Sequence, residues 1–328
     1  MTRVLVLGGT GWLSGRIAER WRDAGAEVTC FARGGRCAPA GTELLRGNRD
    51  AADAYAPLER QQWDEIVDVS SRANHVRAAV DALGPRTRHW TYISTVSVYA
   101  DDQSTGADES GPRHRAARPG DEYDYAAENV AAEDAVVALG VPTSVIRPGL
   151  IVGRGDLTDR FGYWAAAFAR AGDAPVLTPP LEGAQVQIID VDDVAAFAAS
   201  TERTGITNAA GDPVSLRALL DAVRARIGHA GEVIEAPPGW LEEQGVDYWA
   251  GERSLPLWLP PGMAGFSSRA NAAYRRAGGT FTPLIETIDA VRDDEKLRGY
   301  DRARRAGLSR ADELALIDAL RGTHPPLR

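Results

Sequence analysis

The 328-residue chain is predicted to be an α/β protein with a doubly wound parallel sheet and a smaller C-terminal substrate lobe. Two observations predict this fold. Short apolar runs alternate with helical segments through the first half of the chain, which is typical of repeated βα units in a parallel sheet. After Gly149 the pattern changes to helices separated by stretches rich in proline and glycine.

Apolar runs predict the strands, and the amphipathic segments between them predict the helices. We expect strands at 4–7, 27–32, 43–46, 65–69, 90–94 and 143–147. We expect helices at 12–24, 51–60, 74–83 and 125–139. Because apolar parallel strands are covered by helices on both faces, these elements form one Rossmann-type domain at 1–150. Later segments around 183–211 should complete its sheet.

The region 151–328 is assigned mainly to a substrate lobe and C-terminal helices. Helical patterns occur at 161–171, 216–227 and 284–291. A last helix should begin at the N-cap Ser309, with Asp312 three residues on, and run to about Arg321. It should turn four apolar side chains toward the body: Leu314, Leu316, Ile317 and Leu320. The polar stretch 101–121 is too long for an ordinary connection, which predicts a functional or mobile loop.

Composition excludes several classes of protein. A net charge of −9 and an isoelectric point near 5.2 argue against nucleic-acid and anionic-membrane partners, because their phosphates would be repelled. No apolar run is long enough to span a bilayer and no leader pattern is present, so we expect a soluble, cytoplasmic protein. Cys30 and Cys37 are the only cysteines and lack the spacing of a zinc site, so no metal is expected.

The glycine-rich turn at the N-terminus is the strongest functional signal. Gly8-Gly9-Thr10-Gly11 lies between the first apolar strand and the first helix. In that position, backbone N–H groups and the positive end of a helix can hold a pyrophosphate. A plain βα turn that merely needs glycine is the alternative.

Four motifs together carry a resemblance to a known family. They are Gly8-Gly9-Thr10-Gly11-Trp12-Leu13, Ile93-Ser94-Thr95-Val96-Ser97-Val98-Tyr99, Arg147-Pro148-Gly149 with the residues up to Gly153, and Ile189-Asp190-Val191-Asp192-Asp193-Val194. The chain resembles the extended short-chain dehydrogenase/reductase family, also called the NAD-dependent epimerase/dehydratase family. The resemblance runs along most of the chain and is strongest over 1–215. It implies an NAD(P)-binding first domain and an oxidoreductase activity.

The resemblance also implies cofactor-binding residues. Arg33 ends the second strand where an acidic residue would favour NAD, so it favours NADP(H) over NAD(H), with Arg36 as a helper. The alternative is that Arg33 is an ordinary surface arginine that follows a strand and binds no cofactor. Ser14 stands where the family has its third glycine. The other matching positions are Gly8, Thr10, Gly11, Trp12, Leu13, Asn48, Ser70, Ser71, Pro148 and Gly149.

The family's catalytic residues are Ser or Thr, Tyr, and a Lys four residues after the Tyr. The matches are Thr95, with Ser97 as the fallback, and Tyr125, with Tyr123 as the competing candidate. The lysine position holds Asn129, and the sole lysine, Lys296, is remote in sequence. Asparagine can still donate to a ribose but adds no positive charge to favour the phenolate. A neutral Tyr125 suits reduction, where it gives a proton, better than alcohol oxidation.

Substrate-binding residues are expected at the start of the substrate lobe. Arg160 is a candidate for binding an anionic group of the substrate. Tyr163 or Trp164 is a candidate for stacking on a ring of the substrate. An N-cap at Thr158 with ordinary packing behind it is the alternative. Ser97 and Gln187 complete the substrate-binding candidates.

The sequence thus predicts an NADPH-dependent reductase of a small-molecule carbonyl or imine, in a setting such as secondary metabolism. Two alternatives remain: an epimerase, dehydratase or cyclase on the same scaffold, and a catalytically silent NADP-binding sensor. The helix carrying Tyr125 makes a dimer seam in relatives, so a homodimer is one expected assembly. The residues do not name the substrate.

Overall fold

The computed structural model describes residues 1–323 and separates them into two compact units. The first unit comprises Met1–Ile151, Ile188–Asp212 and Ser268–Phe281. The second unit comprises Val152–Gln187, Pro213–Ser267 and the chain from Thr282 onward. Segment 268–281 therefore belongs to the first unit, whereas the sequence alone placed it in the substrate lobe.

The first unit is built on one parallel sheet, which confirms the predicted fold class. Among residues 1–323, this sheet has seven strands in the order β11-β6-β5-β4-β1-β2-β3. The strands are β1 (Arg3–Leu7), β2 (Glu27–Ala32), β3 (Glu43–Arg46), β4 (Glu65–Asp68), β5 (Trp90–Ile93), β6 (Thr143–Pro148) and β11 (Gly205–Ala209). The six strands expected in 1–150 are all present, each within one residue of its predicted ends.

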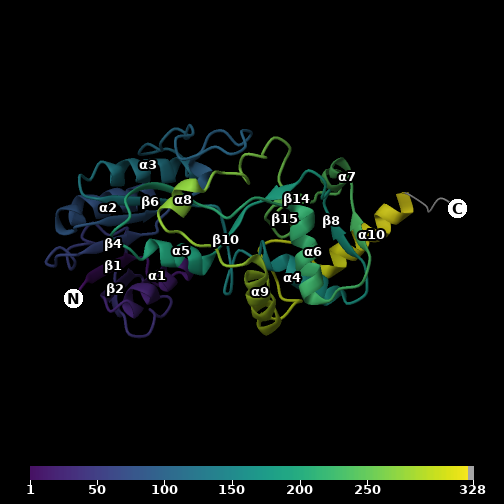
Figure 1. Ribbon diagram of the computed structural model, residues 1–328, viewed down its shortest axis with the longest axis horizontal. Coiled ribbons are helices and arrows are strands. Elements are labelled where there is room, and N and C mark those ends of the chain that lie inside the picture. The colour runs from purple at the N-terminus through teal and green to yellow at the C-terminus, as the bar shows by residue number, and fades with distance from the viewer. Residues whose placement is uncertain (324–328) are drawn as a thin grey trace. The chain divides into compact units, whose positions relative to one another are not determined.

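Helices cover both faces of this sheet (Figure 1). On one face, α1 (Trp12–Asp23) and α5 (Val191–Ala198) pack against alternate strand residues such as Val4 and Val6. On the other, α2 (Ala73–Leu83) and α3 (Tyr125–Val137) pack against the intervening residues, such as Leu5 and Leu7. The alternation follows from the two-residue side-chain period of a strand. Both core clusters are therefore dictated locally by the apolar strands.

Segment 51–60 was expected to be helical, and this prediction is wrong. The segment forms consecutive turns, closed by i→i+3 bonds such as Ala54 N–H to Ala51 O and Leu58 N–H to Tyr55 O. Pro57 lies in the middle of the segment and has no N–H to donate. A proline there removes a helical hydrogen bond and clashes with the preceding turn.

Polar loop 101–121 is anchored to the first unit along its length. Backbone bonds join Ala100 N–H to Pro112 O at 2.9 Å and Gly106 N–H to Ser268 O at 2.7 Å. The Arg113 guanidinium pairs with Glu133 at 3.0 Å and with Asp134 at 2.9 Å, both on α3. The basic stretch 111–115 thus holds the loop to α3 through Arg113.

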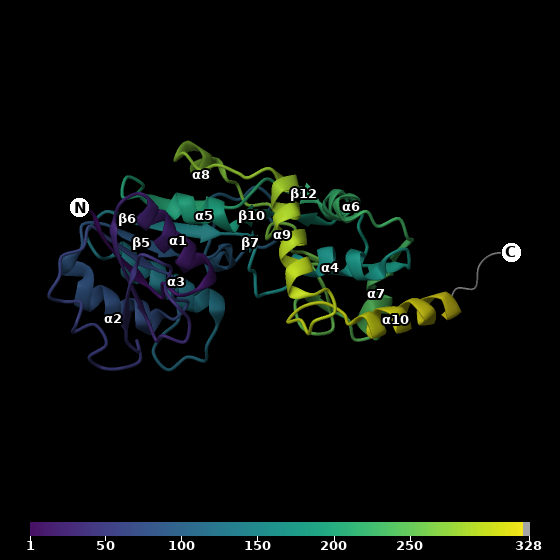
Figure 2. The same ribbon diagram turned by 90° about the horizontal axis from the view of Figure 1, so that it is seen from below.

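Short elements complete the first unit. They are the 3-10 turns η1 (Gly84–Arg86) and η2 (Val96–Val98), helix α8 (Ala272–Arg276), and the paired strands β7 (Leu150–Val152) and β10 (Ile188–Asp190). Figure 2 shows α5 and α8 on the side of the sheet opposite α2 and α3. This agrees with the core cluster in which Tyr274 of α8 packs with α1 and α5.

The second unit is mainly helical. Its helices are α4 (Gly162–Ala171), α6 (Leu216–Ile227), α7 (Pro238–Glu243), α9 (Leu284–Arg298) and α10 (Arg310–Thr323). Its short strand pairs are β8 (Val176–Thr178) with β13 (Val233–Glu235), β9 (Gln185–Val186) with β12 (Val214–Ser215), and β14 (Asp247–Trp249) with β15 (Ser254–Pro256). The helices expected at 161–171 and 216–227 are confirmed, and α9 extends beyond its predicted end.

The C-terminal helix begins as expected. The Ser309 hydroxyl accepts a hydrogen bond from the Asp312 N–H at 3.1 Å, which confirms Ser309 as the N-cap. Leu316, Ile317 and Leu320 are buried, but Leu314 is 39% exposed and lies off the packed face. No helix among residues 1–323 is long and apolar enough to cross a membrane.

Candidate functional site

A cavity of about 860 Å³ lies in the first unit where strands β1 to β4 end. Its lining includes Leu7 at the end of β1, Phe31 and Ala32 at the end of β2, and Val69 just after β4. Ligands of doubly wound sheets bind at the carboxyl ends of the strands, and the volume is in the usual range of ligand pockets. Of the predicted cofactor residues, the cavity is lined by Gly8, Thr10, Gly11, Arg33, Asn48 and Ser70.

The glycine-rich turn is shaped by two close contacts. A Cβ on Gly9 would lie 2.6 Å from Sγ of Cys30, so any larger residue would push the turn off β2. Gly8 has a φ of +87°, a conformation that other residues rarely adopt. Both glycines are thus required by the backbone path rather than by composition.

Ser14, at the family's third glycine position, takes part in this turn. Its buried hydroxyl donates to the Gly8 carbonyl at 2.7 Å and accepts from the Gly11 N–H at 3.1 Å. The side chain therefore braces the turn from inside the first helical turn. This departure from the glycine pattern is compatible with the turn's geometry.

Several arginines give the cavity its positive charge. Arg33 and Arg36 line it, and neither forms an ion pair with a carboxylate in the part of the chain that the structure describes. Arg49 differs, because its guanidinium is bound to the fully buried carboxylate of Asp68 at 2.6 Å. Burial disfavours the charge of Arg49, but Asp68 outweighs this and raises the pKa of Arg49. Arg33, Arg36 and Arg72 thus line the cavity without an ion pair among residues 1–323, although Arg33 and Arg72 act electrostatically on the carboxylate of Asp50.

Sequence reasoning missed four charged or titratable cavity residues, Arg49, Asp50, Arg72 and His75. Nε2 of His75 lies 2.7 Å from Oδ1 of Asp50, and this hydrogen bond lowers the pKa of Asp50, with smaller contributions from Arg72 and Arg33. The signal was available for Asp50 and Arg72, which directly follow the segments already assigned to the cofactor. His75 is brought in by α2, which the linear motif did not include.

The remaining cofactor candidates are not among the residues that line this cavity. Trp12 and Leu13 open α1, and Ser71 accepts a hydrogen bond from the Tyr123 hydroxyl at 3.3 Å. Pro148 is buried at the end of β6, and the Gly149 N–H donates to the Ala209 carbonyl at 3.0 Å. Their roles toward a cofactor stay predictions.

Tyr125 is the first residue of α3, directly after its N-cap Asp124. The Asp124 carboxylate accepts from the Ala127 N–H at 2.7 Å, which fixes the start of the helix. The Tyr125 side chain is 45% exposed. The competing candidate Tyr123 is 53% exposed and lies in the loop, with the guanidinium of Arg72 over its ring. The helix start thus gives Tyr125 the more defined position.

Asn129 lies one helical turn after Tyr125 and is engaged within the protein. Its Nδ2 donates to the Tyr125 carbonyl at 2.7 Å, and its Oδ1 accepts from the Tyr92 hydroxyl at 2.7 Å. The side chain is only 1% exposed. The expectation that this amide presents itself to a ribose is therefore not met in the structure.

Thr95 caps the 3-10 turn η2. Its hydroxyl accepts from the Ser97 N–H at 3.1 Å and lies 3.1 Å from the Ser97 hydroxyl. Thr95 is 7% exposed, whereas Ser97 is half-buried. The two hydroxyls proposed as first choice and fallback are therefore neighbours joined by a hydrogen bond.

A buried ion pair holds α3 to the sheet behind these residues. Arg147 on β6 is bound through two nitrogens to Glu133 on α3, at 2.8 Å and 2.7 Å, and both side chains are almost fully buried. The Ser94 hydroxyl also donates to Glu133. Burial disfavours the charge of Arg147, but Glu133 outweighs this and raises the pKa of Arg147. This network fixes the helix that carries Tyr125.

The substrate candidates of the second unit divide into two groups. Tyr163 and Trp164 are fully buried, and Nε1 of Trp164 donates to the Pro256 carbonyl at 2.9 Å. The expectation that either ring stacks on a substrate does not hold, because a fully buried ring offers no face to a ligand. Gln187 is also buried, at 4% exposure. Arg160 is half-buried, with its guanidinium 4.9 Å from the ring centre of Trp249.

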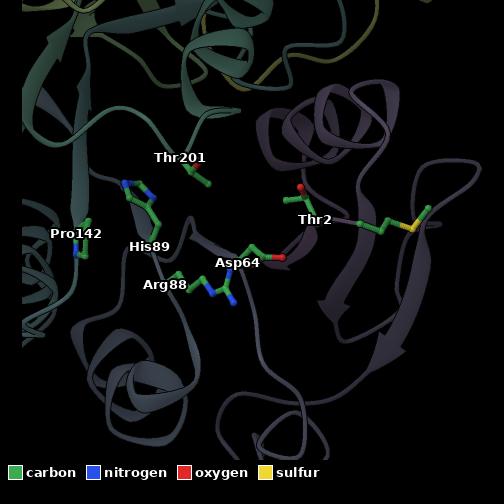
Figure 3. A pocket seen from close by; sticks show the side chains of 7 residues that line it. Thr2, Asp64, Arg88, His89, Pro142 and Thr201 are labelled. Carbon is green, nitrogen blue, oxygen red and sulfur yellow. Dashed lines mark ion pairs between the residues drawn. The ribbon is translucent and has the colours of Figure 1, made fainter.

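A second depression, of about 520 Å³, lies at the opposite end of the strands (Figure 3). It is lined by residues that precede the strands, among them Thr2, Asp64, His89 and Pro142. Ligands of this fold class bind at the carboxyl ends, so this depression is not the expected cofactor site. No cluster of metal-ligating side chains occurs among residues 1–323.

Comparison with known proteins finds similar structures but no sequence relatives. No model of a known protein family matches the chain, and no curated protein matches it. The fold is shared with a provisionally assigned epimerase from Burkholderia cenocepacia (TM-score 0.72, 22% identity, 90% of this chain and 98% of that one). It is shared with UDP-N-acetylglucosamine 4-epimerase from Bacillus cereus (TM-score 0.68, 13% identity, 94% of this chain and 100% of that one). It is also shared with Bordetella bronchiseptica WbmG, solved in complex with NAD and UDP (TM-score 0.65, 14% identity, 91% of this chain and 96% of that one).

Proposed function

We propose that this protein is an oxidoreductase of the extended short-chain dehydrogenase/reductase family that uses NADPH to reduce a small-molecule carbonyl or imine. The observation that carries the proposal is the cavity at the ends of β1 to β4, whose lining includes a glycine-rich turn and the arginines Arg33 and Arg36. Structures of the same fold have been solved with NAD bound, which supports a nicotinamide dinucleotide as the ligand.

The residues in the cavity fit such a cofactor. Gly8, Thr10 and Gly11 line the cavity at the start of α1, and the positive end of that helix favours a pyrophosphate there. The N–H groups of Gly8 and Gly11 themselves donate to the Phe31 carbonyl and the Ser14 hydroxyl, which holds the turn in shape. Arg33 follows β2, where its guanidinium can form paired hydrogen bonds with a 2′-phosphate, and Arg36 adds a second positive charge. This is why NADP(H) is favoured over NAD(H).

Tyr125 is assigned as the proton donor. When bound, NADPH supplies a hydride to the carbon of the carbonyl or imine. The Tyr125 hydroxyl gives its proton to the oxygen or nitrogen of that group, and solvent reprotonates the phenolate, since the side chain is 45% exposed. The Thr95 hydroxyl is assigned to polarise the acceptor. Asn129 is then a positioning residue that acts through Tyr125. Because position 129 holds no cation, nothing there favours the phenolate form of Tyr125.

The absence of a lysine at position 129 is what favours reduction over epimerisation. An epimerase must first oxidise an alcohol, and a base that takes the alcohol proton has to be a phenolate. A reductase needs only the neutral phenol. The alternative of an epimerase or dehydratase has its support in the named activities of the similar structures.

Titration of the purified protein with NADPH and NADH tests the cofactor assignment. We expect tighter binding of NADPH. Arg33→Ala should weaken NADPH about tenfold or more, since hydrogen bonds to a charged group contribute about 1.5–3 kcal/mol, and should leave NADH unchanged. Arg88→Ala, which removes an exposed arginine at the opposite end of the strands, is the matched control. Equal binding of both cofactors in all variants would contradict the assignment.

Turnover is tested by following NADPH consumption over a panel of carbonyls and imines. We expect consumption with at least one substrate class and its loss in Tyr125→Phe. Tight NADPH binding without consumption by any substrate would favour a redox-neutral enzyme or a silent sensor instead. The small-molecule substrate, a cytoplasmic location and a homodimer through the helix that carries Tyr125 remain parts of the proposal.

A further inference from the structure

Arg72 is a cation of the cofactor cavity to which no role has been assigned. It is the N-cap residue of α2, and it lines the cavity. Its backbone N–H donates to the Ser70 hydroxyl at 3.2 Å, which fixes its position in the segment after β4. Within residues 1–323 its guanidinium makes no hydrogen bond and no ion pair. The guanidinium carbon lies 5.3 Å from the ring centre of Tyr123.

The contact with Tyr123 leaves the N–H groups of Arg72 available. A guanidinium that lies over the face of a ring keeps its N–H groups at its edge, where they can form paired hydrogen bonds with phosphate oxygens. Arg49 lines the same cavity but differs, because its guanidinium is bound to the Asp68 carboxylate and to the His75 carbonyl. Arg72 is therefore able to bind an anionic ligand, whereas Arg49 holds the protein's own structure.

A carboxylate of the protein is held against the start of α2. Asp50 lines the cavity, and its Oδ1 lies 2.7 Å from Nε2 of His75. The His75 N–H donates to the Arg72 carbonyl at 3.1 Å, so His75 and Arg72 belong to the same helical turn. Arg49, the residue before Asp50, donates to the His75 carbonyl at 2.9 Å. The loop after β3 is thus bound to the helix end that carries Arg72.

The other end of the same loop lies beside Arg33. The Gly47 N–H donates at 3.0 Å to the carbonyl of the last residue of β2, which directly precedes Arg33. The loop therefore runs from the end of β2 to the start of α2. His75 and, to a smaller extent, Arg72 and Arg33 lower the pKa of Asp50, as expected for a carboxylate that is attracted from both sides of the cavity.

We propose that Arg72 is a second 2′-phosphate-binding residue of the cavity, and that the 2′-phosphate of NADP(H) binds between Arg72 and Arg33. A phosphate monoester carries a charge of about −1.5 to −2 and three acceptor oxygens, so it can accept hydrogen bonds from both guanidinium groups. Asp50 then competes with the phosphate for the two arginines and lowers the affinity of the site. The inference rests on the proposed function, because it assigns further residues to the same cofactor.

The place of Asp50 in the cavity favours the 2′-phosphate over the pyrophosphate as the partner of Arg72. The pyrophosphate is favoured at the start of α1, beside the glycine-rich turn. Arg33 follows β2, where this class of fold binds the ribose of the adenosine half. Because the Asp50 carboxylate is attracted by both Arg33 and Arg72, the two arginines share the ribose side of the cavity.

Two nucleotides separate the 2′-phosphate from the rest of the cofactor. Adenosine 2′,5′-bisphosphate and 5′-AMP differ in the 2′-phosphate alone, and neither contains nicotinamide. Their binding to the full-length protein is measured by calorimetry at constant ionic strength, since salt screens charges at an exposed site. We expect the bisphosphate to bind at least about tenfold more tightly than 5′-AMP. Equal affinities for the two nucleotides would overturn the proposal.

Substitutions of opposite sign test Arg72 and Asp50. Arg72→Gln should reduce the preference for the bisphosphate about tenfold, because hydrogen bonds between two charged groups are lost. Asp50→Asn should increase the preference about threefold, because a negative charge near the phosphate is removed while the amide oxygen can still accept from His75. Arg72→Lys keeps the charge without the planar fork, so it should retain part of the preference.

Matched controls make the same changes of charge elsewhere in the first unit. Arg86→Gln, at the exposed end of η1, and Asp53→Asn, in the turns after β3, should leave the preference unchanged. An unchanged preference in Arg72→Gln would overturn the assignment. An equal loss of affinity for both nucleotides would also overturn it, because Arg72 would then bind another part of the cofactor. No gain in Asp50→Asn would refute the competition with the phosphate.

These outcomes are distinct from a failure of the proposed function. If the preference depends on Arg72 but NADPH is not consumed with any carbonyl or imine, the reductase assignment falls and the 2′-phosphate site stands. If Arg33→Ala weakens NADPH binding and Arg72→Gln leaves the bisphosphate preference unchanged, the inference alone falls. Absence of binding of either nucleotide to the parent protein overturns the inference together with the cofactor assignment.

Discussion

The Tyr92 hydroxyl donates to Oδ1 of Asn129 at 2.7 Å, at the position where the resembled family has a lysine. The carbonyl of Ser70 lies 3.0 Å from the same hydroxyl, and Nδ2 of Asn129 donates to the Tyr125 carbonyl. Burial, with smaller effects from Asp68 and Tyr125, raises the pKa of Tyr92 well above its usual value, so Tyr92 remains a donor. A neutral chain of hydrogen bonds thus ties the first turn of α3 to β5.

Loss of the Tyr92 hydroxyl should destabilise the protein. In Tyr92→Phe, Oδ1 of Asn129 stays buried without its donor, so the free energy of unfolding should fall by about 1–3 kcal/mol. Urea unfolding measures this change. Tyr163→Phe, which removes an equally buried hydroxyl of the second unit, is the control. In a double-mutant cycle, Tyr92→Phe and Asn129→Ala should show a coupling of about 0.5 kcal/mol or more, and additive effects would contradict the link.

A lysine at position 129 should change the pH dependence of activity. The ammonium would lie near the carbonyl of Tyr125 and the hydroxyl of Tyr92, which can both accept hydrogen bonds. A positive charge there favours the phenolate of Tyr125, so the alkaline limb of the pH–rate profile should move to lower pH in Asn129→Lys. Asn129→Met, neutral and of similar length, should leave the limb unmoved. An unchanged limb in Asn129→Lys would remove Tyr125 as the acid.

The Ser14 hydroxyl should stabilise both the turn and cofactor binding. Ser14→Ala loses the bonds to Gly8 and Gly11, which should lower the free energy of unfolding by about 1 kcal/mol and weaken NADPH binding. Thermal unfolding and NADPH titration measure the two effects. Ser14→Gly, which restores the family's glycine, should lose the same hydroxyl contacts. Full stability and affinity in Ser14→Ala would show that the hydroxyl does not brace the turn.

Stability should fall as the pH rises above about 6.5 because of His89, near the depression of Figure 3. Nδ1 lies 2.6 Å from Glu65 and Nε2 lies 2.8 Å from the Arg203 carbonyl, so both ring nitrogens face acceptors. Burial opposes the charged ring, but Glu65 outweighs it and raises the pKa of His89. Burial likewise raises the pKa of Glu65. The folded pair therefore keeps a proton that the unfolded histidine releases.

Urea unfolding between pH 6 and pH 9 tests this linkage, with pH values chosen around the reference pKa of histidine, about 6.5. A retained proton gives a loss of up to about 1.4 kcal/mol per pH unit until the folded pair itself releases it. In Glu65→Gln the amide can donate to the neutral ring, so this part of the slope should disappear. His114→Gln, at an exposed loop position, should keep the parent slope. Parallel slopes in Glu65→Gln and the parent would contradict the shared proton.

Much of the first unit could be predicted because its signals are local. Short apolar runs define β1 to β6, and the caps Asp124 and Ser309 mark two helix starts. The helix predicted at 51–60 does not form because Pro57 interrupts a segment whose apolar spacing is otherwise typical of a helix. The cavity was found through Gly8 and Gly11, since a glycine-rich turn between a strand and a helix has one main geometry.

The other parts of the candidate site depend on contacts between distant segments. Tyr163 and Trp164 have the composition of a stacking site, but other segments of the second unit bury them completely. Trp249 is brought to Arg160 by a strained turn that no local pattern announces. Asn129 was expected to face a ribose, yet Tyr92 on β5 already binds its amide.

The sequence by itself determined the parallel sheet, its glycine-rich turn, and the loss of the lysine after Tyr125. Each of these is a property of one short segment, because strand period, turn conformation and side-chain charge are set by neighbouring residues. The tertiary structure alone decided which polar groups are already satisfied within the protein and which aromatic rings stay accessible. Burial and hydrogen bonding depend on segments far apart in the chain, which local periodicity does not encode.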